Sequence, residues 1–167
     1  MGINFQQSIV CKLGGHINSE LELVISHPPI KEGETNLKKI INQCLPIGCK
    51  AGEVIEKKYN KNRLISYIFS IEKNDERDDL FSFSILLKKK QEAGLYKSIL
   101  KKFIRLLDQH GLLSEAIFKK YQKSIYNSFN QEVDLEIENI VFHISEIFKE
   151  KRKEFGKSEL DVRGSFF

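Results

Sequence analysis

The stretch Arg63-Leu-Ile-Ser-Tyr-Ile-Phe-Ser-Ile71 decides the fold, together with Leu80-Phe-Ser-Phe-Ser-Ile-Leu-Leu87. Side chains alternate between the two faces of a strand, so each run has one wholly apolar face and one face that also carries serine. The segment between them, Lys73-Asn-Asp-Glu-Arg-Asp-Asp79, is too polar to bury and long enough for a hairpin loop. We therefore predict an antiparallel hairpin whose apolar face is covered by helices.

Composition places the chain among ordinary globular proteins. Its 167 residues suffice for one domain with a substantial core, and 41% of them are hydrophobic and 30% charged. The net charge of +4 comes from 27 basic and 23 acidic residues, a mixed balance without the basic face typical of nucleic-acid binders. The apolar runs are far shorter than the roughly 20 residues that span a bilayer, and the start of the chain lacks the layout of a signal peptide. We expect a cytoplasmic protein that binds no nucleic acid and makes at most peripheral contact with a membrane.

The segments before the hairpin predict two strands, a helix and a third strand. Phe5–Leu13 and Glu20–Ser26 have strand patterns and are separated by a turn that contains Gly14-Gly15. Apolar residues recur at helical spacing from Thr35 to about Leu45, where a proline follows. A linker then leads into a strand over Glu53–Tyr59. With the hairpin, these segments predict an α+β fold: a five-stranded antiparallel sheet with helices on both faces.

The segments after the hairpin are helical in pattern. Apolar stripes run along residues 95–109 and 115–129, and we expect both helices on the sheet face opposite the 37–45 helix. A third stripe predicts a last helix from about Glu132 to Phe155, beyond which residues 156–167 form a loosely ordered tail. The predicted organisation is a domain over residues 1–130, an additional amphipathic helix over residues 131–155 and that tail.

The stripe of the last predicted helix is too long to leave in water, so it needs a cover. It packs either on the chain's own helices or against a partner or second subunit, and we favour a contribution to self-association. The residues assigned to this contact are Ile137, Ile140, Val141, Ile144, Ile147 and Phe148.

Patterns that support catalysis or metal binding are weak. Only His143 of the four histidines lies inside a predicted helix, on the side away from the stripe, which favours a solvated histidine. Cys11, Cys44 and Cys49 are an odd number, lack the spacing of a zinc site, and fit a reducing compartment. The acidic residues between Asp75 and Asp79 lack the pattern of a calcium loop and are interpreted as a solvated hairpin tip. We predict no enzymatic activity, no cofactor and no metal site.

The order of short motifs along the chain resembles a known family. Leu45-Pro-Ile-Gly-Cys-Lys-Ala-Gly-Glu53 precedes the strand Leu64-Ile-Ser-Tyr-Ile-Phe69, and Phe81-Ser-Phe-Ser-Ile-Leu86 follows it. A tyrosine-bearing helix then begins with Leu95-Tyr-Lys-Ser-Ile-Leu100, and Gly-Leu-Leu stands at 111–113 between helices. From about residue 5 to residue 129, the chain resembles longin-like domains, including those of DENN-type and folliculin-like proteins and of archaeal longin-type proteins.

The resemblance implies both a fold and a class of function. Longin-like domains have a five-stranded antiparallel sheet with one helix on one face and two on the other. They are scaffolds instead of enzymes, so the implied partner is a small GTPase, trafficking-type machinery or a second longin-type subunit, with a homodimer among the options. No catalytic residue is carried over. The predicted helix from Glu132 is an addition to this plan.

Two other classes of protein stay open. A profilin-like actin-regulating module also combines an antiparallel sheet with helices, although profilins open with an aromatic-bearing helix and this chain opens with strand-like Ile9-Val10. The second is an unrecognised protein that binds or converts a small molecule, for which a deep polar pocket is the discriminating feature.

Overall fold

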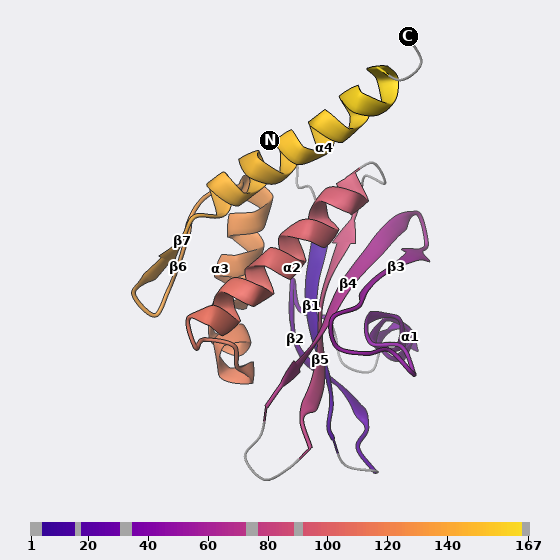
Figure 1. Cartoon of the computed structure of the whole chain (residues 1–167). Coiled ribbons are helices and arrows are strands. Elements are labelled where there is room, and N and C mark those ends of the chain that lie inside the picture. The colour runs from indigo at the N-terminus through magenta and orange to yellow at the C-terminus, as the bar shows by residue number, and fades with distance from the viewer. Residues whose placement is uncertain (1–4, 16–17, 31–34, 73–76, 89–91, 165–167) are drawn as a thin grey trace.

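A five-stranded antiparallel sheet forms the centre of the computed structural model, which describes residues 5–15, 18–30, 35–72, 77–88 and 92–164 (Figure 1). The strands are β1 (Phe5–Leu13), β2 (Leu21–His27), β3 (Val54–Tyr59), β4 (Asn62–Ile71) and β5 (Asp79–Leu87). They lie in the order β2-β1-β5-β4-β3, and every neighbouring pair is antiparallel. The predicted fold class is confirmed.

Helices cover both faces of this sheet, as the stripes predicted. Of the helices that the structure describes, α1 (Thr35–Cys44) covers one face, and α2 (Ala93–Gln109) and α3 (Glu115–Gln131) cover the other (Figure 1). Ser114 begins α3 by accepting a hydrogen bond from the Ile117 N–H, which satisfies a donor that the first helical turn leaves open.

The central hairpin has the predicted register and apolar face. Tyr67 lies opposite Phe83, and Phe69 lies opposite Phe81. All four side chains are buried in the core beneath α2 and α3. The Phe83 ring lies 6.1 Å from that of Phe103 in α2, centroid to centroid. The alternation read from the sequence therefore sets the main core.

The other face of the hairpin builds a second, smaller core beneath α1. Leu64 and Ile68 of β4 and Leu86 of β5 pack there with Ile40 and Ile41 of α1, among other apolar residues. Serines share this face: the Ser66 and Ser84 hydroxyls lie 2.6 Å apart and hydrogen-bond to each other while buried. The mixed face is thus buried as well, and the Ser66–Ser84 pair satisfies two of its hydroxyls within the sheet.

The prediction of one continuous helix from Glu132 to Phe155 is wrong over its first part. Residues there form a small hairpin of β6 (Leu135–Ile137) and β7 (Ile140–Phe142). Glu132 ends α3 in the left-handed conformation, with a φ of 56°. Glu138 and Asn139 are also left-handed, at φ 48° and 67°, and such pairs make the two-residue turns that suit twisted hairpins.

The last helix, α4 (Ile144–Gly164), begins later and ends later than predicted. At its start, the Asp134 carboxylate accepts hydrogen bonds from the Ser145 hydroxyl and the Ser145 N–H, at 2.8 and 3.3 Å. Residues 156–164, assigned to a loose tail by the sequence, are helical. Gly156 costs only about 1 kcal/mol in a helix, and no proline follows it.

The hairpin β6–β7 and α4 belong to the main core. Phe148 of α4 lies 5.7 Å from the ring of Tyr96 in α2 and 6.2 Å from the ring of Phe129 in α3. Phe142 of β7 lies 6.3 Å from Phe103. At the surface, the Arg152 guanidinium donates hydrogen bonds to both carboxylate oxygens of Glu132. The residues beyond 131 therefore complete the layer formed by α2 and α3.

Candidate interaction groove

One edge of the sheet is open where β4 extends beyond its shorter neighbour β3. The pairing of these strands runs from Tyr59 opposite Asn62 to Val54 opposite Tyr67. Ile68 then makes two more hydrogen bonds, accepting from the Gly52 N–H at 2.7 Å and donating to the Glu53 carbonyl at 2.9 Å. On its other side, β4 stays paired with β5 as far as Ile71. Beyond Ile68, then, β4 pairs with a strand on one side only among the described residues.

The main chain of Ser70 faces this open edge. Backbone groups of successive strand residues point to opposite sides, so Ser70 presents its N–H and C=O in the same direction as Ile68. None of the described residues forms a hydrogen bond with these two groups. Gly52, whose φ is +96°, lies in a tight turn in which the Glu53 N–H donates to the Lys50 carbonyl, so the extended pairing of β3 does not continue before it. One donor and one acceptor of the sheet therefore have no strand beside them among the residues that the structure describes.

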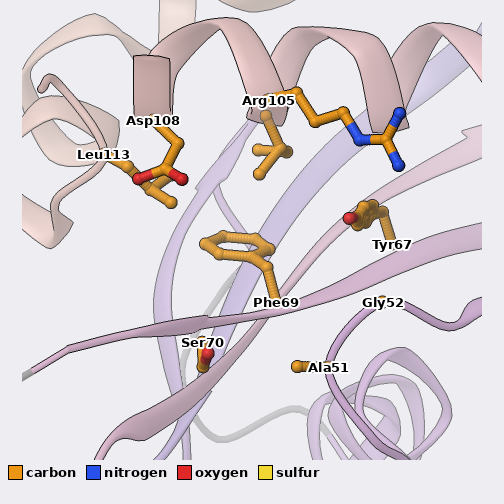
Figure 2. Close-up of a pocket in the computed structure, with 9 residues that line it drawn as sticks. Ala51, Gly52, Tyr67, Phe69, Ser70, Arg105, Asp108 and Leu113 are labelled. Carbon is orange, nitrogen blue, oxygen red and sulfur yellow. The ribbon is translucent and has the colours of Figure 1, made fainter. Parts of the chain in front are cut away.

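A pocket of about 290 Å³ lies beside this edge, between β4 and the C-terminal part of α2 (Figure 2). Figure 2 shows the Phe69 ring pointing toward α2, with Arg105 and Asp108 above it, while the Ser70 side chain points away from that ring. Leu113 closes one end. The remaining lining residues are Ala51, Gly52, Tyr67 and Ile104.

The pocket continues along β4 into a second one of about 360 Å³, which shares Ser70, Asp108 and Leu113 with the first. We call the two together the β4 groove. Its charges are graded: Arg105 lines only the first part, Glu72 lines only the second, and Asp108 lines both. All three are exposed, and within the described chain no ion pair involves any of them.

The loop that borders the groove carries a fully exposed apolar side chain. This loop joins α1 to β3 and provides Ala51 and Gly52 to the pocket wall. Ile47, near its start, is wholly exposed. Left-handed Gly48 lies next to it, at φ +85°. A single exposed isoleucine is common on protein surfaces, so Ile47 marks the loop beside the groove without assigning a contact by itself.

The residues predicted to mediate self-association do not form one surface. Ile137, Ile144 and Phe148 are fully buried in the main core, and Ile147 nearly so. Ile140 is half-buried, and only Val141, at 50% exposure, lies open. Most of the stripe therefore packs on the chain's own helices, which is the first of the two arrangements that the sequence left open. Self-association stays a prediction. Of the residues assigned to it, only Val141 and part of the Ile140 side chain are accessible to a second subunit.

Val141 borders a third pocket, of about 210 Å³, between α2, β7 and α4. Its lining includes His110, His143 and Glu146. His143 is exposed, as predicted, but it precedes α4 instead of lying inside a helix. Its Nδ1 lies 3.3 Å from an Asp134 oxygen that is separate from the one bound by Ser145. This pairing arranges the start of α4, and no serine or cysteine is hydrogen-bonded to the imidazole among the described residues.

The cysteines are poorly suited to nucleophilic chemistry. Cys11 and Cys44 are fully buried and free. A hydrogen bond with the Cys44 thiol, followed by burial, raises the pKa of Cys11 well above its ordinary value. Partial burial also raises the pKa of Cys49. Since the thiolate is the reactive form, all these effects lower reactivity. Across the described residues, no three His, Cys, Asp or Glu side chains cluster as metal ligands would.

The interpretation of Asp79 as part of a solvated hairpin tip is wrong. Asp79 begins β5 and is buried, accepting a hydrogen bond from the Gly15 N–H at 3.1 Å and lying 3.7 Å from the Lys12 ammonium. It ties the β1–β2 turn to the central hairpin. Residues 73–76, which include other members of that acidic segment, lie outside the described residues.

Sequence reasoning missed the β4 groove, although a signal for it exists. A tight turn joins the third strand to the fourth and fixes their register, and the run Glu53–Tyr59 is shorter than the run Arg63–Ile71. Antiparallel neighbours of unequal length joined by a tight turn must leave an overhang on the longer strand. The difference in strand length does not predict that Arg105 and Asp108 line the groove. It does not predict which residues form the floor of the pocket either.

No family model matches the chain, and no curated protein is significantly similar to it in sequence. Within the described residues, every helix is too short or too polar to cross a membrane.

Proposed function

We propose that this protein is a non-enzymatic, longin-like interaction module that binds a small GTPase or a protein of trafficking-type machinery. The observation that carries the proposal is the arrangement of helices about the sheet. One helix lies on one face of five antiparallel strands and two lie on the other. This is the plan that the longin-like resemblance implies. The hairpin β6–β7 and α4 are additions to it.

The accessible surface supports a contact with a protein. The β4 groove combines an open sheet edge, an apolar floor and charges of both signs, and it is bordered by the loop that exposes Ile47. Main-chain groups at an open sheet edge suit an extended segment of another polypeptide, which pairs with them as an added strand. A cytoplasmic location is part of the same proposal.

A binding panel tests the proposal. The full chain is immobilised, and purified small GTPases are passed over it, each in its GDP-bound and its GTP-analogue-bound form. We expect at least one of them to bind with a Kd below about 100 μM, and to prefer one nucleotide state, because its switch segments differ between the two. An unrelated globular protein at the same density is the control for nonspecific binding.

Charge reversal separates a specific contact from a general electrostatic one. Arg105→Glu alters the groove, and Lys39→Glu places the same charge change on α1, on the opposite face of the sheet. We expect only the first to weaken a GTPase bound at the groove. If no small GTPase binds in either state while the chain co-sediments with actin filaments or retains monomeric actin, the profilin-like alternative replaces the proposal.

A further inference from the structure

The open segment of β4 has the chemistry of a strand acceptor. Ser70 presents one N–H and one C=O on the line along which β3 would continue if it did not turn away at Gly52. A second polypeptide strand satisfies a donor and an acceptor at this spacing, because it offers the reciprocal pair in the same plane. Within the described part of the chain, no strand lies next to β4 alongside its last residues.

The side chains around the open edge at Ser70 indicate which kind of strand can bind there. Arg105 lines the end of the groove that Tyr67 and Gly52 also line, and Glu72 lines the other end. Asp108 lines both parts of the groove. Residues two apart on a strand share a face and are about 7 Å apart. Helix residues three apart, such as Arg105 and Asp108, are separated by about 5–6 Å. An acidic side chain and a basic side chain two positions apart on a strand therefore match the two charges above the groove.

We infer that the β4 groove binds an extended peptide segment of a partner protein, which pairs with Ser70 as an additional strand. The segment carries an acidic residue toward Arg105 and, two positions away, a basic residue toward Asp108 and Glu72. Tyr67, Phe69 and Leu113 support the aliphatic parts of these side chains. The inference rests on the proposed function only in treating the groove as a protein-binding surface, and it does not require the partner to be a small GTPase.

The first test selects peptides without assuming a partner. A phage-displayed library of random linear nine-residue peptides is panned on the full chain, and the most enriched sequence is synthesised. We expect enrichment of an acidic residue and a basic residue two positions apart. Exchange of the Ser70 amide proton, followed by NMR, should slow by about tenfold or more when the peptide is saturating, because the amide gains a partner. Failure to enrich any peptide, or an unchanged Ser70 amide, overturns the inference.

Main-chain pairing is tested on both molecules. Ser70→Pro removes the outward N–H at an edge position where proline is compatible with a strand, and it should weaken the peptide by about fivefold, the value of one net hydrogen bond. Ser70→Ala keeps the N–H and should bind as the wild type does. Single N-methylation along the peptide should weaken binding at alternate positions only. This peptide series decides the question even if Ser70→Pro fails to fold, and an equal response at all positions overturns strand pairing.

Charge exchange tests the direction of the peptide. Arg105→Glu should weaken the selected peptide, and changing its acidic residue to lysine should restore binding to that variant but not to the wild type. If the wild type forms a dimer that Ser70→Pro abolishes, the groove pairs two copies of this chain and the inference of a partner peptide is overturned. A small GTPase whose binding ignores both Ser70→Pro and Arg105→Glu would leave the proposed function standing and remove this surface from it.

Discussion

At the scale of single residues, stability is concentrated in a few aromatic side chains. Phe83 is fully buried at the middle of β5, and its ring lies 5.8 Å from that of Phe118 and 6.2 Å from that of Phe129. These two contacts join the sheet to α3, and the contact of Phe83 with Phe103 joins it to α2. Ile47 is the opposite case, an apolar residue of the α1–β3 loop that is wholly exposed. Both side chains are apolar, but Phe83 holds the core together and Ile47 makes no contribution to it.

We expect Phe83→Ala to lower the free energy of unfolding by about 3–5 kcal/mol, because it leaves a cavity between the sheet and two helices. This is a large part of the roughly 5–15 kcal/mol that stabilises a typical domain. Urea unfolding followed by circular dichroism measures the change. Ile47→Ala is the matched control and should stay within about 0.5 kcal/mol of the wild type. A Phe83→Ala variant as stable as this control would show that the ring does not hold the core.

At the scale of elements, the start of α4 depends on one carboxylate. The hydrogen bond from the Ser145 hydroxyl, aided by the His143 side chain and the Ser145 N–H, lowers the pKa of Asp134 from its ordinary value. A lowered pKa means that the folded state favours the ionised form more than the unfolded state does. Asp134 therefore stabilises the protein at pH values above about 3.9, the pKa of an unfolded aspartate, and this contribution is lost as the pH falls through the folded value.

The variant Asp134→Asn tests that role. We expect it to be less stable than the wild type near neutral pH, and we expect the difference to close as the pH approaches about 2, where both side chains are neutral. Unfolding midpoints measured across this pH range give the answer. Glu136→Gln, which removes an exposed carboxylate from the neighbouring β6, is the control for the loss of one negative charge. A constant gap between Asp134→Asn and the wild type at all pH values would contradict the linkage.

At the scale of the whole molecule, the C-terminal elements are part of the fold instead of an appendage. Leu135, Phe142 and Phe148 are buried in the same core as the aromatic residues of α2 and α3. Each buried side chain of this size contributes about 1.5–3 kcal/mol. Burial of the apolar side chains of β6, β7 and α4 together thus contributes a free energy comparable with the net stability of an entire domain. The C-terminal end of α4 extends past the sheet in Figure 1.

Two truncations distinguish these parts. A chain that ends after Gln131 exposes Tyr96, Phe103 and Phe129, and we expect it to lose cooperative unfolding and to bind a hydrophobic dye. A chain that ends after Glu154 keeps these contacts and should unfold with a midpoint close to that of the full chain. Urea titration and dye fluorescence measure both. If the shorter chain folded as stably as the full one, residues 1–130 would be an independent domain.

The sequence by itself determined the sheet, the three helices that cover it and the apolar face of the central hairpin. These features follow from local periodicity: Tyr67, Phe69 and Phe83 alternate at strand spacing, and the residues of α2 and α3 recur at helical spacing. A period of two and a period of 3.6 residues place apolar side chains on one face whatever the neighbours are. The wholly apolar face and the face that carries serine were therefore both predictable from the chain alone.

Only the tertiary structure decided the C-terminal region and the candidate site. Ile137, Ile140 and Ile144 stand at spacings that suit a helix, but Glu138 and Asn139 turn the chain back, and the core beneath α2 accepts the resulting hairpin. The β4 groove exists because β3 leaves the sheet edge before β4 ends and because α2 brings Arg105 over that gap. Both outcomes depend on contacts between segments far apart in the sequence. Local patterns do not contain such contacts, because their energy is realised only when the elements pack together.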